Sequence, residues 1–232
     1  MDDAFRNRLA QYGQQHVLTF WDELTPAQQA RLAAQLREVD LDLLTRLWRG
    51  EQAAADWAKL ASKAQPPPAI RLGQPHPQFD AAAARRAGEQ HLAAGQVGAV
   101  LVAGGQGTRL GFDAPKGMFP IGPVSGSTLF QILLEKVAAC RERYGVAIPL
   151  YLMTSPATHE ATVEYLRRVE YFGLPADDVR IFCQGTMPAV DAATGKLLLE
   201  AKDSLALSPD GHGGMLAAMV RGGVLDDIGR RG

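Results

Sequence analysis

The sequence predicts an α/β protein whose core is a doubly wound, Rossmann-like parallel sheet. Apolar runs at residues 97–103, 148–154 and 179–183 have the length and β-branched content of buried parallel strands. Segments with helical periodicity separate them, which is the strand–helix alternation of a doubly wound domain. Ligands of such sheets bind beyond the carboxyl ends of the strands. Three segments follow predicted strands in this way and are candidates for a ligand site: 104–117, 184–188 and 208–214.

Composition and charge argue against several classes of protein. The chain has 232 residues, 47% of them hydrophobic, and a formal net charge of −1, which disfavours binding of nucleic acid through bulk charge. The N-terminus lacks the apolar core of a signal peptide, and no run approaches a membrane span. Cys140 and Cys183 lie in apolar runs, so we expect buried thiols in a reducing compartment. These features predict a cytoplasmic protein without nucleic-acid or membrane partners. We expect a monomer or weak oligomer.

Residues 1–64 are predicted to form a helical N-terminal region. Thr25 followed by Pro26 is typical of a helix start, and leucines at helical spacing continue from there. All three tryptophans of the chain, Trp21, Trp48 and Trp57, lie in this region, so its helices must pack against something. His16 lies on an apolar helical stripe, and we interpret it as a packing residue rather than a ligand.

Residues 65–95 are predicted to connect this region to the sheet domain at 96–232. The connector begins with a stiff, polyproline-like segment at 65–68. A helix of about residues 79–94 follows and ends at Gly95.

Local signals place the remaining elements of the sheet domain. Ser127 and Thr128 cap a helix that runs to about Tyr144, and a second helix runs from Pro156 to about Tyr171. Further predicted elements are a hairpin-like turn at 191–196, a helix from about Met215 and a short helix at 224–230.

The stretch after the first apolar run is predicted to bind phosphate. It combines the cations Arg109 and Lys116 with glycines at 104, 105, 107, 111 and 117. Glycine backbone can turn its N–H groups on an anion because no Cβ blocks the approach. The spacing fits neither a P-loop, since Lys116 follows a proline, nor a dinucleotide fingerprint, since Gly111 comes one position late. The alternative is a flexible surface loop with solvated charges.

This stretch resembles a known family. Residues 103–111, AGGQGTRLG, and 115–118, PKGM, are similar to the signature loop of the eukaryotic-type UDP-sugar pyrophosphorylases (UDPGP type 1), most of all the UDP-N-acetylglucosamine pyrophosphorylase branch. Further blocks resemble the family in its own order, at 153–155, 171–174, 184–188 and 209–211. The resemblance implies a nucleotidyltransferase fold that is incomplete here, because in the family the chain continues past the position of Gly232. We therefore expect a C-terminally truncated chain.

The resemblance implies uridylyl transfer, in which a sugar 1-phosphate attacks the α-phosphorus of UTP to give a UDP-sugar and pyrophosphate. The enzyme must align two anions that repel each other and stabilise charge on the transferring phosphorus. Catalytic roles are implied for Arg109, near the leaving pyrophosphate, and for Lys116, near the reacting phosphates. His212 is implied to contact the sugar phosphate. The residues implied to bind the nucleotide are Gly104, Gly105, Gly107, Thr108, Gln184 (through the uracil edge) and Gly211.

The resemblance also implies a cofactor, Mg²⁺, held with the help of an aspartate that in the family lies beyond the position of Gly232. No metal ligand is therefore expected within this chain. For Asp210, we favour the role of a helix cap over that of a metal ligand.

Several alternatives stay open. Gln184 could cap a loop, and His212 could be a turn residue. The sugar is expected to be an N-acetylhexosamine 1-phosphate on the strength of the blocks around position 212. His212 itself favours glucose 1-phosphate, because N-acetylhexosamine enzymes of this type usually have asparagine there, and broad specificity is a further alternative. A truncated nucleotide-binding protein without turnover is the alternative of another class.

Overall fold

The computed structural model describes residues 2–50, 57–67, 69–71, 73–74 and 80–231. The chain forms two compact units, of which unit 1 comprises Met1–Pro68 and Thr186–Pro209, and unit 2 comprises Ala69–Gly185 and Asp210–Gly232. The predicted boundaries near residues 64 and 95 stay predictions, but the segment 186–209 groups with the N-terminal helices. No helix in the described part of the chain is long and apolar enough to cross a membrane.

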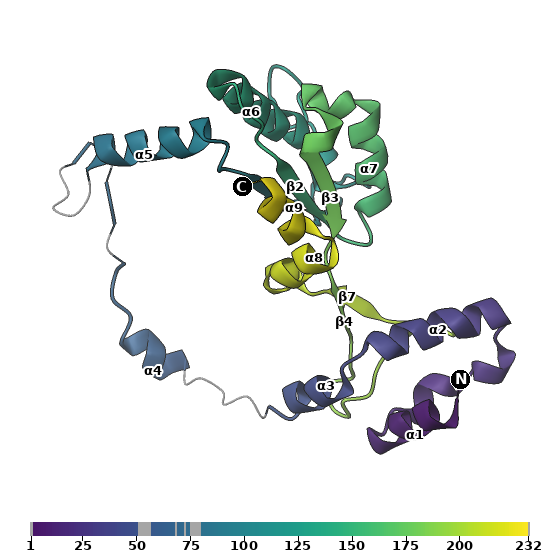
Figure 1. Ribbon diagram of the computed structural model, residues 1–232. Coiled ribbons are helices and arrows are strands. Elements are labelled where there is room, and N and C mark those ends of the chain that lie inside the picture. Colours follow the sequence, from purple (N-terminus) through teal and green to yellow (C-terminus); the bar gives the residue numbers. More distant parts are fainter. Residues whose placement is uncertain (1, 51–56, 68, 72, 75–79, 232) are drawn as a thin grey trace. The chain divides into compact units, whose positions relative to one another are not determined.

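Unit 2 contains a parallel sheet with the predicted alternation of strands and helices (Figure 1). Its strands are β1 (Ala99–Val102), β2 (Leu150–Thr154) and β3 (Val179–Cys183), in the order β1-β2-β3. Its helices are α5 (Ala81–Ala93), α6 (Leu129–Tyr144), α7 (His159–Arg168), α8 (Met215–Arg221) and α9 (Val224–Arg231). Its short 3-10 turns are η3 (Thr108–Leu110), η4 (Lys116–Met118), η5 (Glu170–Gly173), η6 (Ala176–Asp178) and η7 (Gly211–Gly214). The predicted α/β class is confirmed.

Helices cover both faces of β2, which is why all of its residues are buried. Leu150 and Leu152 pack with α6 and α7 in one apolar cluster. Tyr151 and Met153 point to the opposite face and pack with residues of α8 and α9. A central strand of this kind has no solvent face, so its sequence is apolar throughout and lacks alternation.

β1 is less buried than its sequence predicts. Val100 and Val102 are 44% and 40% exposed, although they were expected in a buried strand. The described residues that pack under α8 and α9 come from β2 and β3 and include none from β1. The outer face of β1 therefore stays open in the described part of the chain.

Helix ends in unit 2 follow local capping signals. The Thr128 side chain accepts a hydrogen bond from Gln131 N at the start of α6, and Gly145 ends that helix in a left-handed conformation, with φ of 65°. Gly95, with φ of 71°, follows α5 in the same way. These predicted ends are confirmed, because a cap acts within a few residues.

The helix predicted from Pro156 to Tyr171 is shorter in the structure, where α7 spans His159–Arg168. A turn precedes it and the η5 turn follows it. Thr158 N–H donates to Ser155 O at 3.0 Å, so a turn precedes α7. Glu170, Tyr171 and Phe172 are all left-handed, with φ of 46°, 52° and 52°. Such a conformation costs about 1–2 kcal/mol per non-glycine residue, and it places the partly buried Tyr171 and Phe172 against the apolar cluster of α6 and α7.

Unit 1 combines the predicted N-terminal helices with a β segment. The helices are α1 (Asp3–Gln11), α2 (Pro26–Glu38), α3 (Leu41–Trp48) and α4 (Trp57–Ser62), with 3-10 turns η1 (Gln15–Leu18) and η2 (Trp21–Glu23). The strands are β4 (Thr186–Pro188), β5 (Leu199–Ala201), β6 (Ser204–Leu205) and β7 (Leu207–Pro209). β4 pairs with β7, and β5 pairs with β6, both antiparallel. The predicted turn at 191–196 is confirmed by the bridge between Val190 and Leu197.

Apolar packing and buried hydrogen bonds hold the β segment against the helices. Leu197 and Leu205 are almost fully buried among apolar residues of the N-terminal region. The Gln14 side chain donates to Gly195 O at 3.0 Å and accepts from Leu197 N at 2.9 Å. His16 Nε2 lies 2.7 Å from Leu197 O, which gives His16 a structural contact within unit 1, and its interpretation as a packing residue stays a prediction. Predictions for Pro68, for a helix start at residue 79 and for the Trp57 side chain lie outside the described parts.

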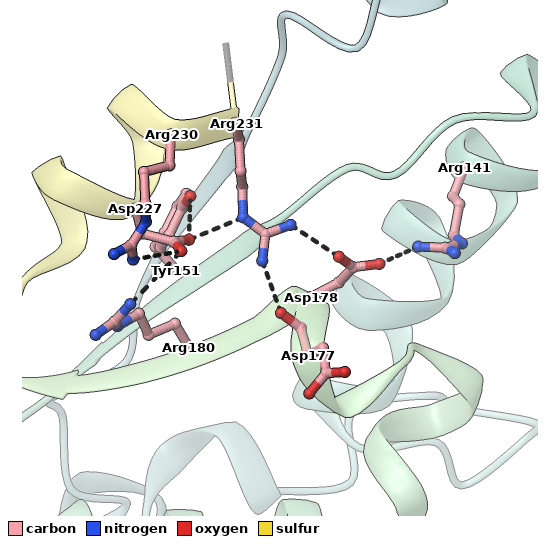
Figure 2. Close-up of polar contacts among 8 residues, drawn as sticks. All are labelled: Arg141, Tyr151, Asp177, Asp178, Arg180, Asp227, Arg230 and Arg231. Carbon is pink, nitrogen blue, oxygen red and sulfur yellow. Dashed lines mark hydrogen bonds and ion pairs between the residues drawn. The ribbon is translucent and has the colours of Figure 1, made fainter.

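A network of charged groups fastens α9 to the sheet (Figure 2). Asp227 on α9 accepts hydrogen bonds from Tyr151 Oη and Arg231 Nε, each at 2.9 Å. Arg231 also donates to Asp178 at 2.9 Å, next to the start of β3. Burial and the hydrogen bond to Asp227 raise the pKa of Tyr151 to about 12. Although burial opposes ionisation, hydrogen bonds from Tyr151 and Arg231 lower the pKa of Asp227.

Candidate functional site

The glycine-rich loop after β1 is closed on itself. Gly107 N donates to Ala114 O at 2.9 Å, and Lys116 N donates to Gly105 O at 3.0 Å. Gln106 and Pro115 form an antiparallel bridge between these two bonds. Backbone hydrogen bonds therefore close the loop into a defined turn.

Gly104 and Gly107 of this loop have neighbours where a side chain would lie. A Cβ at Gly107 would lie 2.7 Å from Phe112 O, and a Cβ at Gly104 would lie 2.8 Å from Gln184 Oε1. Real Cβ contacts essentially never fall below 3.0 Å. A side chain at Gly107 would push against the loop backbone, whereas one at Gly104 would displace the Gln184 side chain.

The loop presents positive charge and free amides. A Cβ at Gly105 would lie 3.9 Å from Lys116 Nζ, so this ammonium group lies over the loop backbone. Lys116 and Arg109 are exposed, and neither forms an ion pair with any residue that the structure describes. The amides of Gly104, Gly105 and Gln106 have no hydrogen-bond acceptor among the described residues. Successive free amides beside two unpaired cations suit a multiply charged anion.

Gln184 lies directly after β3, next to Gly104. Its backbone N–H donates to Thr154 O at 2.8 Å, which continues the pairing of β2 with β3. The residue is only 9% exposed, and its side-chain amide makes no hydrogen bond within the described part of the chain. The Gln184 side chain therefore makes no loop-capping hydrogen bond with the described residues. A nearly buried amide offers one donor group and one acceptor group to a ligand.

Ser155, to which the sequence analysis assigned no role, supports this arrangement. Its Oγ donates to Gly104 O at 2.8 Å and lies 3.0 Å from Thr158 Oγ1. It is 2% exposed. The side chain thus fixes the first glycine of the loop to the end of β2. Its signal in the sequence was the Ser-Pro pair at the end of a strand, which is typical of a turn.

The turn at η7 meets the end of β3 through Asp210. Asp210 N donates to Gly185 O at 3.1 Å. A Cβ at Gly185 would lie 2.3 Å from Asp210 Oδ2, and a Cβ at Gly214 would lie 1.9 Å from the same atom. The carboxylate therefore lies against both glycines, and its Oδ1 is buried without a hydrogen-bond partner. Asp210 precedes η7 but its side chain makes no capping hydrogen bond there, so the predicted side-chain cap is absent.

The structure brings the parts of the predicted segments that belong to unit 2, residues 104–117, 184–185 and 210–214, to one edge of the sheet. Gly104 and Gln184 are in contact, and Gly185 is bonded to Asp210, so the loops after β1 and β3 and the η7 turn lie together. This predicted convergence is confirmed. Thr108, Arg109, Gly211 and His212 are also exposed, and the side chains of Thr108, Arg109 and His212 make no polar contact in the described part of the chain. Their roles toward a ligand stay predictions.

Some predicted details differ. Gly107 was expected to hold a nucleotide through its backbone, but its N–H is bonded to Ala114 O, so it contributes to closing the loop. Cys140 and Cys183 were expected to be buried, but both are free thiols of intermediate exposure. Burial nevertheless raises the pKa of the Cys183 thiol, next to the site. The described residues contain no group of three or more His, Cys, Asp or Glu side chains that could hold a metal ion.

The chain is similar in sequence to proteins of a known family. The family described as UDPGP, UTP--glucose-1-phosphate uridylyltransferase, matches residues 51–232. The chain is 35% identical over 241 residues to UDP-N-acetylglucosamine diphosphorylase 2 of Arabidopsis thaliana, covering 99% of this chain and 48% of the relative. It is 37% identical over 243 residues to UDP-N-acetylhexosamine pyrophosphorylase-like protein 1 of Homo sapiens, covering 98% and 47%. It thus spans about half the length of these curated relatives.

A solved structure shows the same fold. The uridine diphosphate N-acetylglucosamine pyrophosphorylase of Trypanosoma brucei, in complex with an inhibitor, matches with a TM-score of 0.68 and 28% identity. The match covers 94% of this chain and 45% of that chain.

Proposed function

Because the chain belongs to the UTP--glucose-1-phosphate uridylyltransferase family, we propose that its glycine-rich loop binds UTP for uridylyl transfer to a sugar 1-phosphate. One observation carries the proposal: the free amides of the loop, with Lys116 over the loop backbone, lie next to the unbonded, nearly buried amide of Gln184. A phosphate site and a base-reading group at one sheet edge match the two parts of a nucleotide.

The proposed reaction is an in-line displacement that needs no covalent nucleophile. Lys116 lies over the loop backbone and balances negative charge on the reacting phosphates. Arg109, on the exposed η3 turn, stabilises the leaving pyrophosphate. Alignment of two repelling anions is the main contribution of such a site, because the chemistry itself requires little of the protein.

The nucleotide is proposed to lie with its uracil toward Gln184. The amide donates through Nε2 and accepts through Oε1, which suits the adjacent acceptor and donor of a uracil edge. The absence of a side chain at Gly104 leaves room for Gln184 at this position. The backbone of Gly211, left-handed with φ of 66°, belongs to the turn that faces the nucleotide.

The sugar is proposed to be an N-acetylhexosamine 1-phosphate. The curated relatives above are named for UDP-N-acetylglucosamine and UDP-N-acetylhexosamine. His212 is the contrary feature, because an imidazole is bulkier than an asparagine amide and crowds an acetamido group. Glucose 1-phosphate and broad specificity are therefore the competing versions of the proposal, since a single contact of this kind discriminates by only about 1–3 kcal/mol.

Magnesium belongs to the proposal by family membership, but the described residues do not form a site for it. Asp210 Oδ1 is the buried carboxylate oxygen without a partner at the sheet edge, and Asp210 belongs to no metal-binding cluster within the described residues. Mg²⁺ in nucleotide sites is usually held by one or two carboxylates together with the phosphates.

The proposal can be tested by titrating the chain with UTP, UMP and CTP in a calorimeter. Lys116→Ala should weaken UTP more than UMP, because a charged hydrogen bond contributes about 1.5–3 kcal/mol. Gln184→Ala should reduce the preference for UTP over CTP and leave the difference between UTP and UMP unchanged. Lys136→Ala, which removes an exposed lysine from α6, is the matched control for lost charge.

Two outcomes would overturn the proposal. The wild-type chain could show no preference for uridine nucleotides, or both site variants could weaken every nucleotide equally while losing thermal stability. Titration with UDP-N-acetylglucosamine and UDP-glucose in the same series decides between the sugars, and His212→Asn should favour the N-acetylated one. A nucleotide-binding chain without turnover is the competing class of function, and pyrophosphate release with UTP and each sugar 1-phosphate distinguishes it.

A further inference from the structure

The turn that carries Lys116 rests on an aromatic ring. Gly117 is buried in η4, and a Cβ at this position would lie 2.2–2.4 Å from ring atoms Cζ, Cε2 and Cε1 of Phe130. Phe130 is 1% exposed and lies in the first turn of α6. The ring therefore occupies the space in which a side chain at position 117 would lie, directly below the backbone that follows Lys116.

The ring of Phe130 also packs against other aromatic side chains. It packs against Tyr165 of α7, with ring centroids 6.2 Å apart, and Tyr165 packs against Phe172 of the left-handed turn at 6.2 Å. Tyr165 Oη lies 3.0 Å from Thr128 Oγ1, which caps α6. These contacts restrict how far the ring can move, because packed side chains in a core adopt one arrangement.

The position of Lys116 depends on this support. Its side chain is exposed, and no described residue pairs with its ammonium group. The backbone of the turn determines where the flexible side chain begins, through Lys116 N bonded to Gly105 O at 3.0 Å and Met118 N bonded to Pro115 O at 2.9 Å. A change under Gly117 therefore moves the ammonium group relative to the free amides of the loop.

We propose that Phe130 is a positioning residue, which holds the Lys116–Met118 turn so that the Lys116 ammonium group meets the phosphates of a bound nucleotide. This rests on the proposed nucleotide site. Phe130 does not touch the nucleotide, and it acts only through Gly117 and Lys116. Its loss should reduce the advantage of additional phosphates and leave recognition of the base unchanged.

The test measures the ratio of UMP to UTP dissociation constants for the full chain by calorimetry. Phe130→Leu keeps an apolar side chain but removes the ring, and we expect the ratio to fall by about tenfold, a loss no larger than that from removing the Lys116 charge itself. Leu150→Ala is the matched control, because Leu150 is 2% exposed in the same apolar cluster but starts β2, at the opposite end of the sheet. It should lower the melting temperature and leave the ratio unchanged.

A second experiment combines Gly117→Ala with Phe130→Leu, so that the conclusion does not depend on how stable the Phe130→Leu variant is. Gly117→Ala alone should lower the ratio, because its Cβ overlaps the ring and pushes the turn outward. In the double variant, the smaller leucine should make room for that Cβ, so the two changes should reduce the ratio by less than the product of their separate effects.

The outcomes separate the two proposals. If the wild-type ratio is near one, the nucleotide proposal fails and this inference fails with it. If the wild-type chain prefers UTP but Phe130→Leu keeps the wild-type ratio, or changes it no more than Leu150→Ala does, the inference alone is wrong. Independent effects of Gly117→Ala and Phe130→Leu would also overturn it.

Discussion

At the level of single residues, Gly214 is required for space and not for backbone freedom. Its φ is −79°, which any residue can adopt, but its Cβ would lie 1.9 Å from Asp210 Oδ2. Gly214→Ala should therefore destabilise the chain by about 1–3 kcal/mol, as overpacking does. Gly213→Ala is the control, because nothing lies within 4 Å of its Cβ. Urea unfolding followed by circular dichroism measures both, and equal stability of the two variants would contradict the role of Asp210.

At the level of elements, Asp227 links α9 to the sheet through its hydrogen bond with Tyr151 of β2. Asp227→Asn should lower the free energy of unfolding at pH 7 by about 1–3 kcal/mol, because it removes the negative charge that accepts the hydrogen bonds of Arg231 and Tyr151. Since the pKa of Asp227 is lowered in the folded chain, its contribution is present above the unfolded pKa of about 4 and is lost as the pH falls through the folded value. The difference between wild type and variant should therefore disappear in acid.

Asp226 provides the control for this helix. It lies in the same first turn of α9 but is exposed and makes no ion pair with the described residues. Asp226→Asn removes the same favourable interaction with the helix dipole, so any excess loss in Asp227→Asn comes from the network in Figure 2. A pH-independent difference between the two variants would mean that packing, not ionisation, explains the effect of Asp227.

At the level of the whole molecule, residues 186–209 complete the N-terminal unit. Leu205 is fully buried there, whereas Leu198 is 42% exposed. Leu205→Ala should cost about 2–5 kcal/mol and Leu198→Ala about 0.5 kcal/mol or less. All three tryptophans lie in residues 1–64, so tryptophan fluorescence follows the unfolding of this unit. An unchanged fluorescence transition in Leu205→Ala would contradict the grouping.

The sequence by itself determined the features that depend on neighbours a few residues away. β3 is found over residues 179–183, as its apolar run predicts, and α8 begins at Met215 after the glycine-rich turn. Thr25 and Thr128 cap their helices as expected. The convergence of the loops after β1 and β3 also followed, because the carboxyl ends of parallel strands meet at one edge.

Only the tertiary structure decided which distant residues share a contact. The support of Gly117 by Phe130, the insertion of Asp210 between Gly185 and Gly214, and the open face of β1 have no local signal. The burial of Leu205 among helices more than 150 residues earlier in the chain has none either. The physical reason is that caps and periodicity act over one or two turns of backbone, whereas burial and steric fit depend on how separate elements pack together.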